Sequence, residues 1–149
     1  MNLAEYLPPD RVLLLKGRTK ADALAELADV LGEAGLGVGR EELREAIWKR
    51  EGIMSTGIGQ GLAVPHVRMP GVKTAAVAVG ISPEGIADYE SLDNQPVHLI
   101  VMIVAPEGEH ETYLRLLAEI MRAVKDPELR RRIIQAPDTQ TAHSLLVER

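Results

Sequence analysis

Hydrophobic positions recur at two different spacings along the chain, and these spacings predict alternating helices and strands. Leucines three and four residues apart follow Thr19 and stop at Gly35, which predicts a helix capped by Thr19. Leu43 and Ile47, four residues apart, predict a second helix over residues 41–50. The N-terminal third is therefore mainly helical.

Runs rich in valine, isoleucine and leucine predict strands at residues 12–15, 74–81 and 97–105. Residues 97–105 are apolar at almost every position, as in a central strand that is covered on both faces. Leucines and other apolar residues at helical spacing predict three more helices: one after Pro106, one from Asp126-Pro127 to about Ile134, and one capped by Asp138. This interleaving indicates an α/β sandwich.

Composition narrows the class of protein. A chain of 149 residues with 46% hydrophobic content fits one domain over residues 1–149. The absence of cysteine excludes disulfides and cysteine nucleophiles, and a net charge of −5 disfavours nucleic acid as a partner. The N-terminus lacks the pattern of a secretory signal, and the longest apolar run is too short to cross a membrane. We expect a cytoplasmic protein without direct membrane insertion.

The stretch with candidate chemistry is residues 50–66, Arg-Glu-Gly-Ile-Met-Ser-Thr-Gly-Ile-Gly-Gln-Gly-Leu-Ala-Val-Pro-His. Its glycines permit tight turns and close approach, and Pro65 holds Val64 extended, so we expect His66 at the end of a short strand. A neutral imidazole keeps one nucleophilic nitrogen, which can accept a phosphoryl group and release it. A lone histidine is also commonly structural, and the residue type alone leaves both interpretations open.

Other site chemistries fit the sequence poorly. The glycine spacing matches neither G-x-G-x-x-G after a strand nor a P-loop, which disfavours a nucleotide site, and we expect no cofactor. The segment beginning His110-Glu111 lacks the second histidine of H-E-x-x-H, so we expect no metal site. His98 and His143 are predicted to be structural or exposed.

The run from Arg50 to His66 resembles the signature of enzyme IIA type 2 of the sugar phosphotransferase system, the fructose, mannitol and nitrogen-regulatory family. The resemblance continues through residues 93–97, the strand ending in Ala105-Pro106 and the leucine-rich helix beyond it. It implies a single-domain sandwich of helices around a mixed β-sheet. It also implies that His66 is phosphorylated by the histidine phosphocarrier protein. One departure is Val67, where the family usually has glycine.

Arg50 matches the family's arginine near the active histidine. It follows Leu43 by seven residues, so we expect it on the buried face of its helix, where phosphate would be a fitting partner. The less favoured alternative is that it extends to solvent or pairs with Glu45 or Glu51. The hydroxyls of Ser55 and Thr56 could donate to phosphate or fix the His66 tautomer, or could simply satisfy local backbone groups.

The family normally has a second histidine early in the helix after Ala105-Pro106, and this chain has Tyr113 at that position. His110 lies three residues earlier, and positions i and i+3 share a helix face, so it could reach the same pocket. A solvated position in the turn is the favoured alternative for His110.

Two functional hypotheses follow from the resemblance. In the first, phosphoryl moves from the phosphocarrier to His66 and then to a cysteine of an enzyme IIB domain, which this cysteine-free chain does not contain. In the second, the chain is a regulatory module whose phosphorylation state controls its grip on a target protein. A degenerate homologue that is not phosphorylated is a third alternative, because the second histidine is missing.

Overall fold

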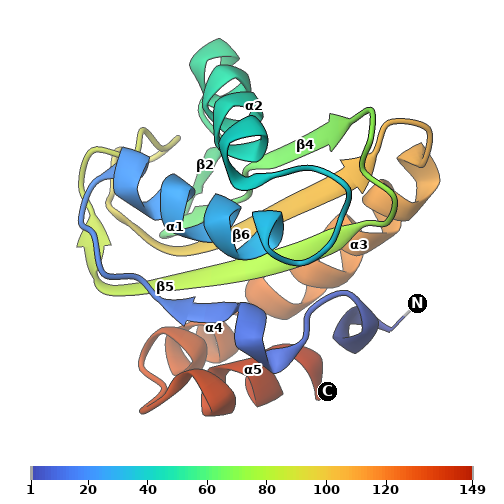
Figure 1. Cartoon of the computed structure of the whole chain (residues 1–149). Coiled ribbons are helices and arrows are strands. Elements are labelled where there is room, and N and C mark those ends of the chain that lie inside the picture. Colours follow the sequence, from blue (N-terminus) through green and yellow to red (C-terminus); the bar gives the residue numbers. More distant parts are fainter. Residues whose placement is uncertain (1, 149) are drawn as a thin grey trace.

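A computed structural model describes residues 2–148 and contains one mixed sheet of six strands, with the order β1-β5-β6-β3-β2 and with β4 also paired to β6 (Figure 1). The strands are β1 (Val12–Leu14), β2 (Gly57–Gly59), β3 (Leu62–Ala63), β4 (His66–Met69), β5 (Ala76–Ile86) and β6 (Val97–Pro106). The pairs β1/β5, β3/β6 and β4/β6 are parallel, whereas β5/β6 and β2/β3 are antiparallel.

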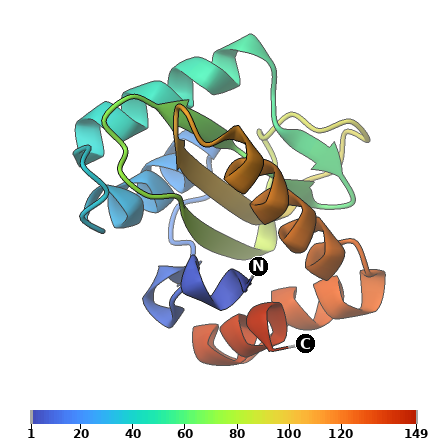
Figure 2. The ribbon, with the colours of Figure 1, turned by 90° about the vertical axis from the view of Figure 1, so that its right-hand side faces the viewer.

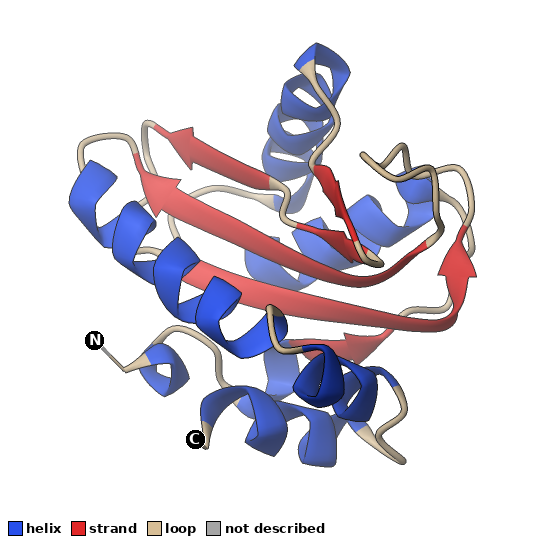
Figure 3. Ribbon diagram, turned by 180° about the vertical axis from the view of Figure 1, so that it is seen from behind, coloured by secondary structure: helices blue, strands red, loops and turns tan. Residues whose placement is uncertain are grey.

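Helices cover both faces of this sheet (Figures 2 and 3). The helices are α1 (Lys20–Gly32), α2 (Arg40–Ile53), α3 (His110–Val124), α4 (Pro127–Ile134) and α5 (Thr139–Val147), with short 3-10 turns η1 (Leu3–Glu5) and η2 (Pro9–Arg11). One core cluster packs α1 and α2 onto the sheet, and the other packs α3, α4 and α5 onto the opposite face. The predicted sandwich of helices around a mixed sheet is confirmed.

The predicted helix starts are supported by side-chain caps. Thr19 Oγ1 accepts a hydrogen bond from the backbone N–H of Asp22 at 3.1 Å, and Asp138 Oδ1 accepts one from Thr141 at 2.7 Å. Asp126 caps α4 in the same way, with proline at the first helical position. These local signals explain why the helix positions are readable from the sequence.

β6 is the central strand, and its burial follows from its neighbours. It pairs with β5 on one edge and with β3 and β4 on the other, and both helical layers cover its faces. His66 stands opposite Ile103 of β6 in parallel register. The prediction that His66 ends a short strand is therefore wrong: β3 ends at Ala63, and His66 begins β4.

The buried face of α2 differs from the prediction. Leu43, Ile47 and Glu51 are buried, whereas Arg50 is only half-buried. Successive steps of four residues carry the buried stripe toward Glu51 rather than Arg50. Arg50 consequently lies at the margin of the core. Across residues 2–148, none of the helices has the length and apolar character that crossing a bilayer requires.

Candidate functional site

A cavity of about 370 Å³ lies where the end of α2, the following loop, β4 and α3 meet. Its lining residues are Arg50, Ser55, Thr56, Ile58, Val64, His66, Tyr113, Leu117 and Met121. The structure thus brings together five of the six residues selected from the sequence, and only His110 is outside the lining.

His66 is half-buried, and the backbone fixes the state of its imidazole. Its Nδ1 atom is 2.9 Å from the carbonyl oxygen of Val64, two residues earlier. A carbonyl can only accept, so Nδ1 carries the proton and Nε2 keeps its lone pair. The nitrogen available for nucleophilic attack is therefore Nε2.

Arg50 reaches the cavity from the last turn of α2. Its Nη1 atom donates to the carbonyl oxygen of Met54 at 3.2 Å. Within residues 2–148 it forms no ion pair with Glu45 or Glu51, so those two alternatives do not apply. The guanidinium retains donors that a bound anion can use.

The hydroxyls of Ser55 and Thr56 are engaged away from His66. Ser55 Oγ donates to the backbone carbonyl of Glu90 at 2.6 Å, and Thr56 Oγ1 donates to Glu51 Oε2 at 2.5 Å. Neither hydroxyl fixes the His66 tautomer, which the Val64 carbonyl sets instead. The two residues line the cavity, and their hydroxyls brace the loop that forms its wall.

A buried ionic cluster that the sequence did not reveal supports this wall. Glu51 pairs with Lys20 Nζ at 3.1 Å, and both side chains are more than nine-tenths buried. Glu51 also accepts the N–H of Thr56 at 3.1 Å, and the Tyr89 hydroxyl lies 2.8 Å from Thr56 Oγ1. Burial, followed by the charge of Glu51, raises the pKa of Tyr89. The one sequence signal for this buried cluster was that Glu51 lies four residues after Ile47, on the buried face of α2.

Tyr113 forms the side of the cavity that α3 contributes. Its ring is 5.2 Å from the His66 ring, between centroids, and the two planes are tilted by 35°. Burial raises the pKa of the Tyr113 hydroxyl, and the charges of Arg50 and Arg68 oppose that rise. His110, the first residue of α3, is exposed, and its Nδ1 lies 2.8 Å from Arg68 Nη1. Arg68 was not selected from the sequence.

Besides Glu51, the carboxylate of Asp93 supports the loop by holding the tight turn between β2 and β3. Gln60 has a φ of 58°, which is rare for a residue other than glycine. Asp93 Oδ2 accepts the Gln60 N–H at 2.8 Å, and Asp93 Oδ1 accepts the Gln95 N–H at 3.1 Å. These backbone hydrogen bonds hold the pKa of Asp93 below its usual range. Asp93 thereby fixes the glycine-rich loop beyond the cavity.

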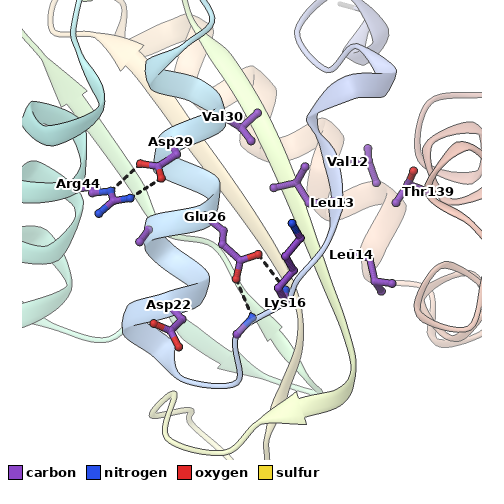
Figure 4. A pocket seen from close by; sticks show the side chains of 12 residues that line it. Val12, Leu13, Leu14, Lys16, Asp22, Glu26, Asp29, Val30, Arg44 and Thr139 are labelled. Carbon is purple, nitrogen blue, oxygen red and sulfur yellow. Dashed lines mark hydrogen bonds and ion pairs between the residues drawn. The ribbon is translucent and has the colours of Figure 1, made fainter.

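A larger depression of about 780 Å³ lies between β1 and α1 (Figure 4). Two of its carboxylates are already paired: Glu26 accepts the backbone N–H groups of Lys16 and Gly17, both at 2.9 Å, and Asp29 pairs with Arg44. Its lining includes no histidine. The smaller cavity, with its nucleophilic nitrogen and its guanidinium, is the better candidate for chemistry.

Among residues 2–148, no group of three or more histidine, aspartate or glutamate residues is arranged to hold a metal ion. A free imidazole nitrogen next to a guanidinium and a phenol suits a nucleophile that accepts an anionic group.

Comparisons with known proteins agree with this arrangement. The family model described as "Phosphoenolpyruvate-dependent sugar phosphotransferase system, EIIA 2" matches residues 5–149. The "PTS system fructose-specific EIIABC component" of Bacillus subtilis is 38% identical over 91% of this chain, which spans 21% of that protein. The fructose-specific EIIA component of Haloferax volcanii is 32% identical, over 87% of this chain and 84% of its own. The structure of nitrogen regulatory protein IIA-Ntr from Neisseria meningitidis superposes with a TM-score of 0.88 at 26% identity, covering 97% of this chain and 98% of that one.

Proposed function

Because the chain belongs to the phosphoenolpyruvate-dependent sugar phosphotransferase system EIIA 2 family, we propose that His66 carries a phosphoryl group between two partner proteins. The observation that carries this proposal is the Nδ1–H hydrogen bond to Val64, because it leaves Nε2 unprotonated at a cavity shared with Arg50. Residues 1–149 act as one phosphocarrier domain.

The transfer balances without a cofactor. The phosphorus–nitrogen bond of the donor phosphohistidine breaks as phosphorus bonds to His66 Nε2, and the donor nitrogen keeps the electron pair. His66 then bears positive charge shared over the ring, which the Val64 carbonyl stabilises through the Nδ1 proton. In the second step an acceptor nucleophile takes the phosphoryl group, and the electron pair returns to Nε2.

Arg50 binds the phosphoryl group in both transfer steps. Arg50 is a half-buried residue that lines the same cavity as His66. The planar fork can hold two phosphoryl oxygens at once. Arg50 therefore stabilises the transferring group on His66.

The surroundings of the cavity suit a protein as donor and acceptor. Ile53 and Met54, just beyond Arg50, are 78% and 71% exposed, and Leu114 next to Tyr113 is 47% exposed. Exposed large apolar side chains that lie together are typical of protein interaction sites. We assign this rim to docking of the histidine phosphocarrier protein and of the acceptor.

The acceptor in the transport version of this function is an EIIB domain. The 149 residues contain no cysteine, so an EIIB cysteine lies outside them. The similarity to the EIIABC component of Bacillus subtilis supports this destination. The similarity to nitrogen regulatory proteins favours the second candidate, in which the phosphorylation state of His66 sets binding to a regulatory target.

Incubation with phosphoenolpyruvate, the first enzyme of the cascade and the phosphocarrier tests the proposal by intact mass. One phosphoryl adduct is expected, and no adduct would contradict the phosphocarrier function. Adding an EIIB domain to the purified adduct separates the two candidates. Loss of the adduct with gain of a phosphocysteine supports transport, whereas retention of the adduct supports the regulatory role.

A further inference from the structure

Arg68 lies beside the cavity although its side chain is not part of the lining. It follows His66 by two residues on β4, so both side chains project from the same face of the sheet. That face carries α3, since Arg68 contacts His110 and His66 stacks against Tyr113. Val67, between them, packs with the core cluster of the opposite face.

Tyr113 connects Arg68 to His66. The Arg68 guanidinium carbon is 5.9 Å from the centre of the Tyr113 ring. The same ring lies 5.2 Å from the His66 ring and 6.4 Å from the His110 ring, between centroids. Both Arg50 and Arg68 lower the pKa of the Tyr113 hydroxyl, although burial raises it more. The two guanidinium groups therefore act on the same region next to His66.

His110 holds Arg68 in this place. Arginine can only donate, so Nδ1 of His110 is the acceptor in the 2.8 Å contact with Nη1. The contact joins β4 to the first turn of α3, 42 residues further along the chain. It uses one donor of the guanidinium and leaves the others available for a new partner.

We propose that Arg68 is a second phosphate-binding arginine, held by His110 beside Tyr113 so that it contacts the phosphoryl group on His66. The inference rests on the proposed phosphocarrier function and adds a residue to its site. His110 is a positioning residue, since it acts through Arg68 and does not touch the phosphoryl group.

The charge of the phosphoryl group explains why a second guanidinium is useful. A phosphoryl group carries between one and two negative charges near neutral pH, and Arg50 supplies one positive charge. Tyr113 is neutral there, since the ordinary pKa of a phenol is about 10 and burial raises the pKa of Tyr113 further. As the donor's phosphorus–nitrogen bond breaks and the bond to Nε2 forms, Arg68 donates hydrogen bonds to the phosphoryl oxygens and exchanges no proton.

The test compares Arg68→Ala with Arg115→Ala, a matched control that removes an exposed arginine of α3 paired with Glu111. With the phosphorylated phosphocarrier as donor, Arg68→Ala should lower kcat for transfer to His66 by about tenfold and leave KM within about twofold. Arg68→Lys should recover part of the rate, because it keeps the charge and loses the fork. Arg115→Ala should match the parent.

A second measurement uses the isolated phosphorylated protein, so that docking to a partner protein cannot affect the result. Hydrolysis of the His66 phosphoryl group, followed by intact mass, should change by about threefold or more in Arg68→Ala and remain unchanged in Arg115→Ala. His110→Ala should reproduce part of the Arg68→Ala loss in kcat, and the double variant should lose no more than Arg68→Ala alone.

The outcomes separate this inference from the proposed function. If the parent accepts one phosphoryl group and Arg68→Ala matches it in kcat and in hydrolysis, Arg68 does not bind phosphate, and the phosphocarrier function stands. A change confined to KM would make Arg68 a docking residue and overturn the inference. Additive losses in the double variant would overturn the role of His110. An unphosphorylated parent would instead contradict the proposed function itself.

Discussion

The Nδ1 atom of His66 lies 2.9 Å from the carbonyl oxygen of Val64. Pro65 between them restricts Val64 to extended backbone, which holds this carbonyl in place. A backbone acceptor cannot be removed by a side-chain substitution. The chain therefore defines its nucleophilic nitrogen through local backbone geometry, independently of the hydroxyl groups nearby.

The tautomer gives the first prediction. Imidazole nitrogen NMR of the unphosphorylated protein above the histidine pKa should show His66 protonated at Nδ1. Ser55→Ala should leave that tautomer unchanged, because the Ser55 hydroxyl bonds to Glu90. A dominant Nε2–H form in the parent would contradict the assignment of Nε2 as the nucleophile.

Arg50→Ala should fold normally and slow transfer to His66 by about a hundredfold, since a charge-assisted contact to the transferring group is lost. Arg50→Lys should recover only part of the rate, because an ammonium lacks the planar fork. Stopped-flow transfer from the phosphocarrier measures both variants. Parent-like transfer in Arg50→Ala would place this arginine outside the mechanism.

Glu51→Gln should lower the free energy of unfolding by about 3 kcal/mol, because it leaves the buried ammonium of Lys20 without its buried partner. The value is at the low end of such losses, since the exposed Glu90 still pairs with Lys20 at 3.1 Å. Denaturant titration measures it. The exposed Glu45 offers the matched control, and Glu45→Gln should stay within about 0.5 kcal/mol of the parent. Equal losses in the two variants would contradict a structural role for the buried pair.

Asp93 predicts a pH dependence of stability. Its pKa is lowered in the folded protein by the Gln60 and Gln95 N–H groups, so its contribution is complete above the unfolded-state value. The contribution is lost as pH falls through the lowered folded value, below about pH 4. Asp93→Asn should therefore lower Tm at pH 7, and the difference in Tm between the variant and the parent should become smaller in acid. A difference that is constant down to pH 2 would contradict this assignment.

The sequence predicted best what depends on neighbours in the chain. The caps of α1, α4 and α5 and the almost wholly apolar β6 are local patterns, and the structure confirms them. The predicted strand ended at residue 81, whereas β5 continues to Ile86. The extension runs through an irregularity in the pairing that contains proline and glycine. Such a continuation depends on pairing with β6 and leaves no local signal.

The sequence predicted which residues line the site, but it did not predict the contacts that support them. Arg50 and His66 of the motif and Tyr113, at the family's second-histidine position, line one cavity. The pairs that support it, Lys20 with Glu51 and Arg68 with His110, join residues 31 and 42 positions apart, and hydrophobic periodicity carries no information about such pairs. Arg68 was missed because a single arginine outside the predicted helices and strands resembles any solvated charge.

The most direct test of the central claim is intact-mass measurement after incubation with phosphoenolpyruvate, the first enzyme of the cascade and the histidine phosphocarrier protein. The account predicts one phosphoryl adduct on the parent, stable in alkali and labile in acid, and none on His66→Ala. His98→Ala, which changes a histidine bonded to the Ser82 carbonyl away from the cavity, should still accept the group. An adduct that persists on His66→Ala, or a parent that takes no phosphoryl group, would contradict the account.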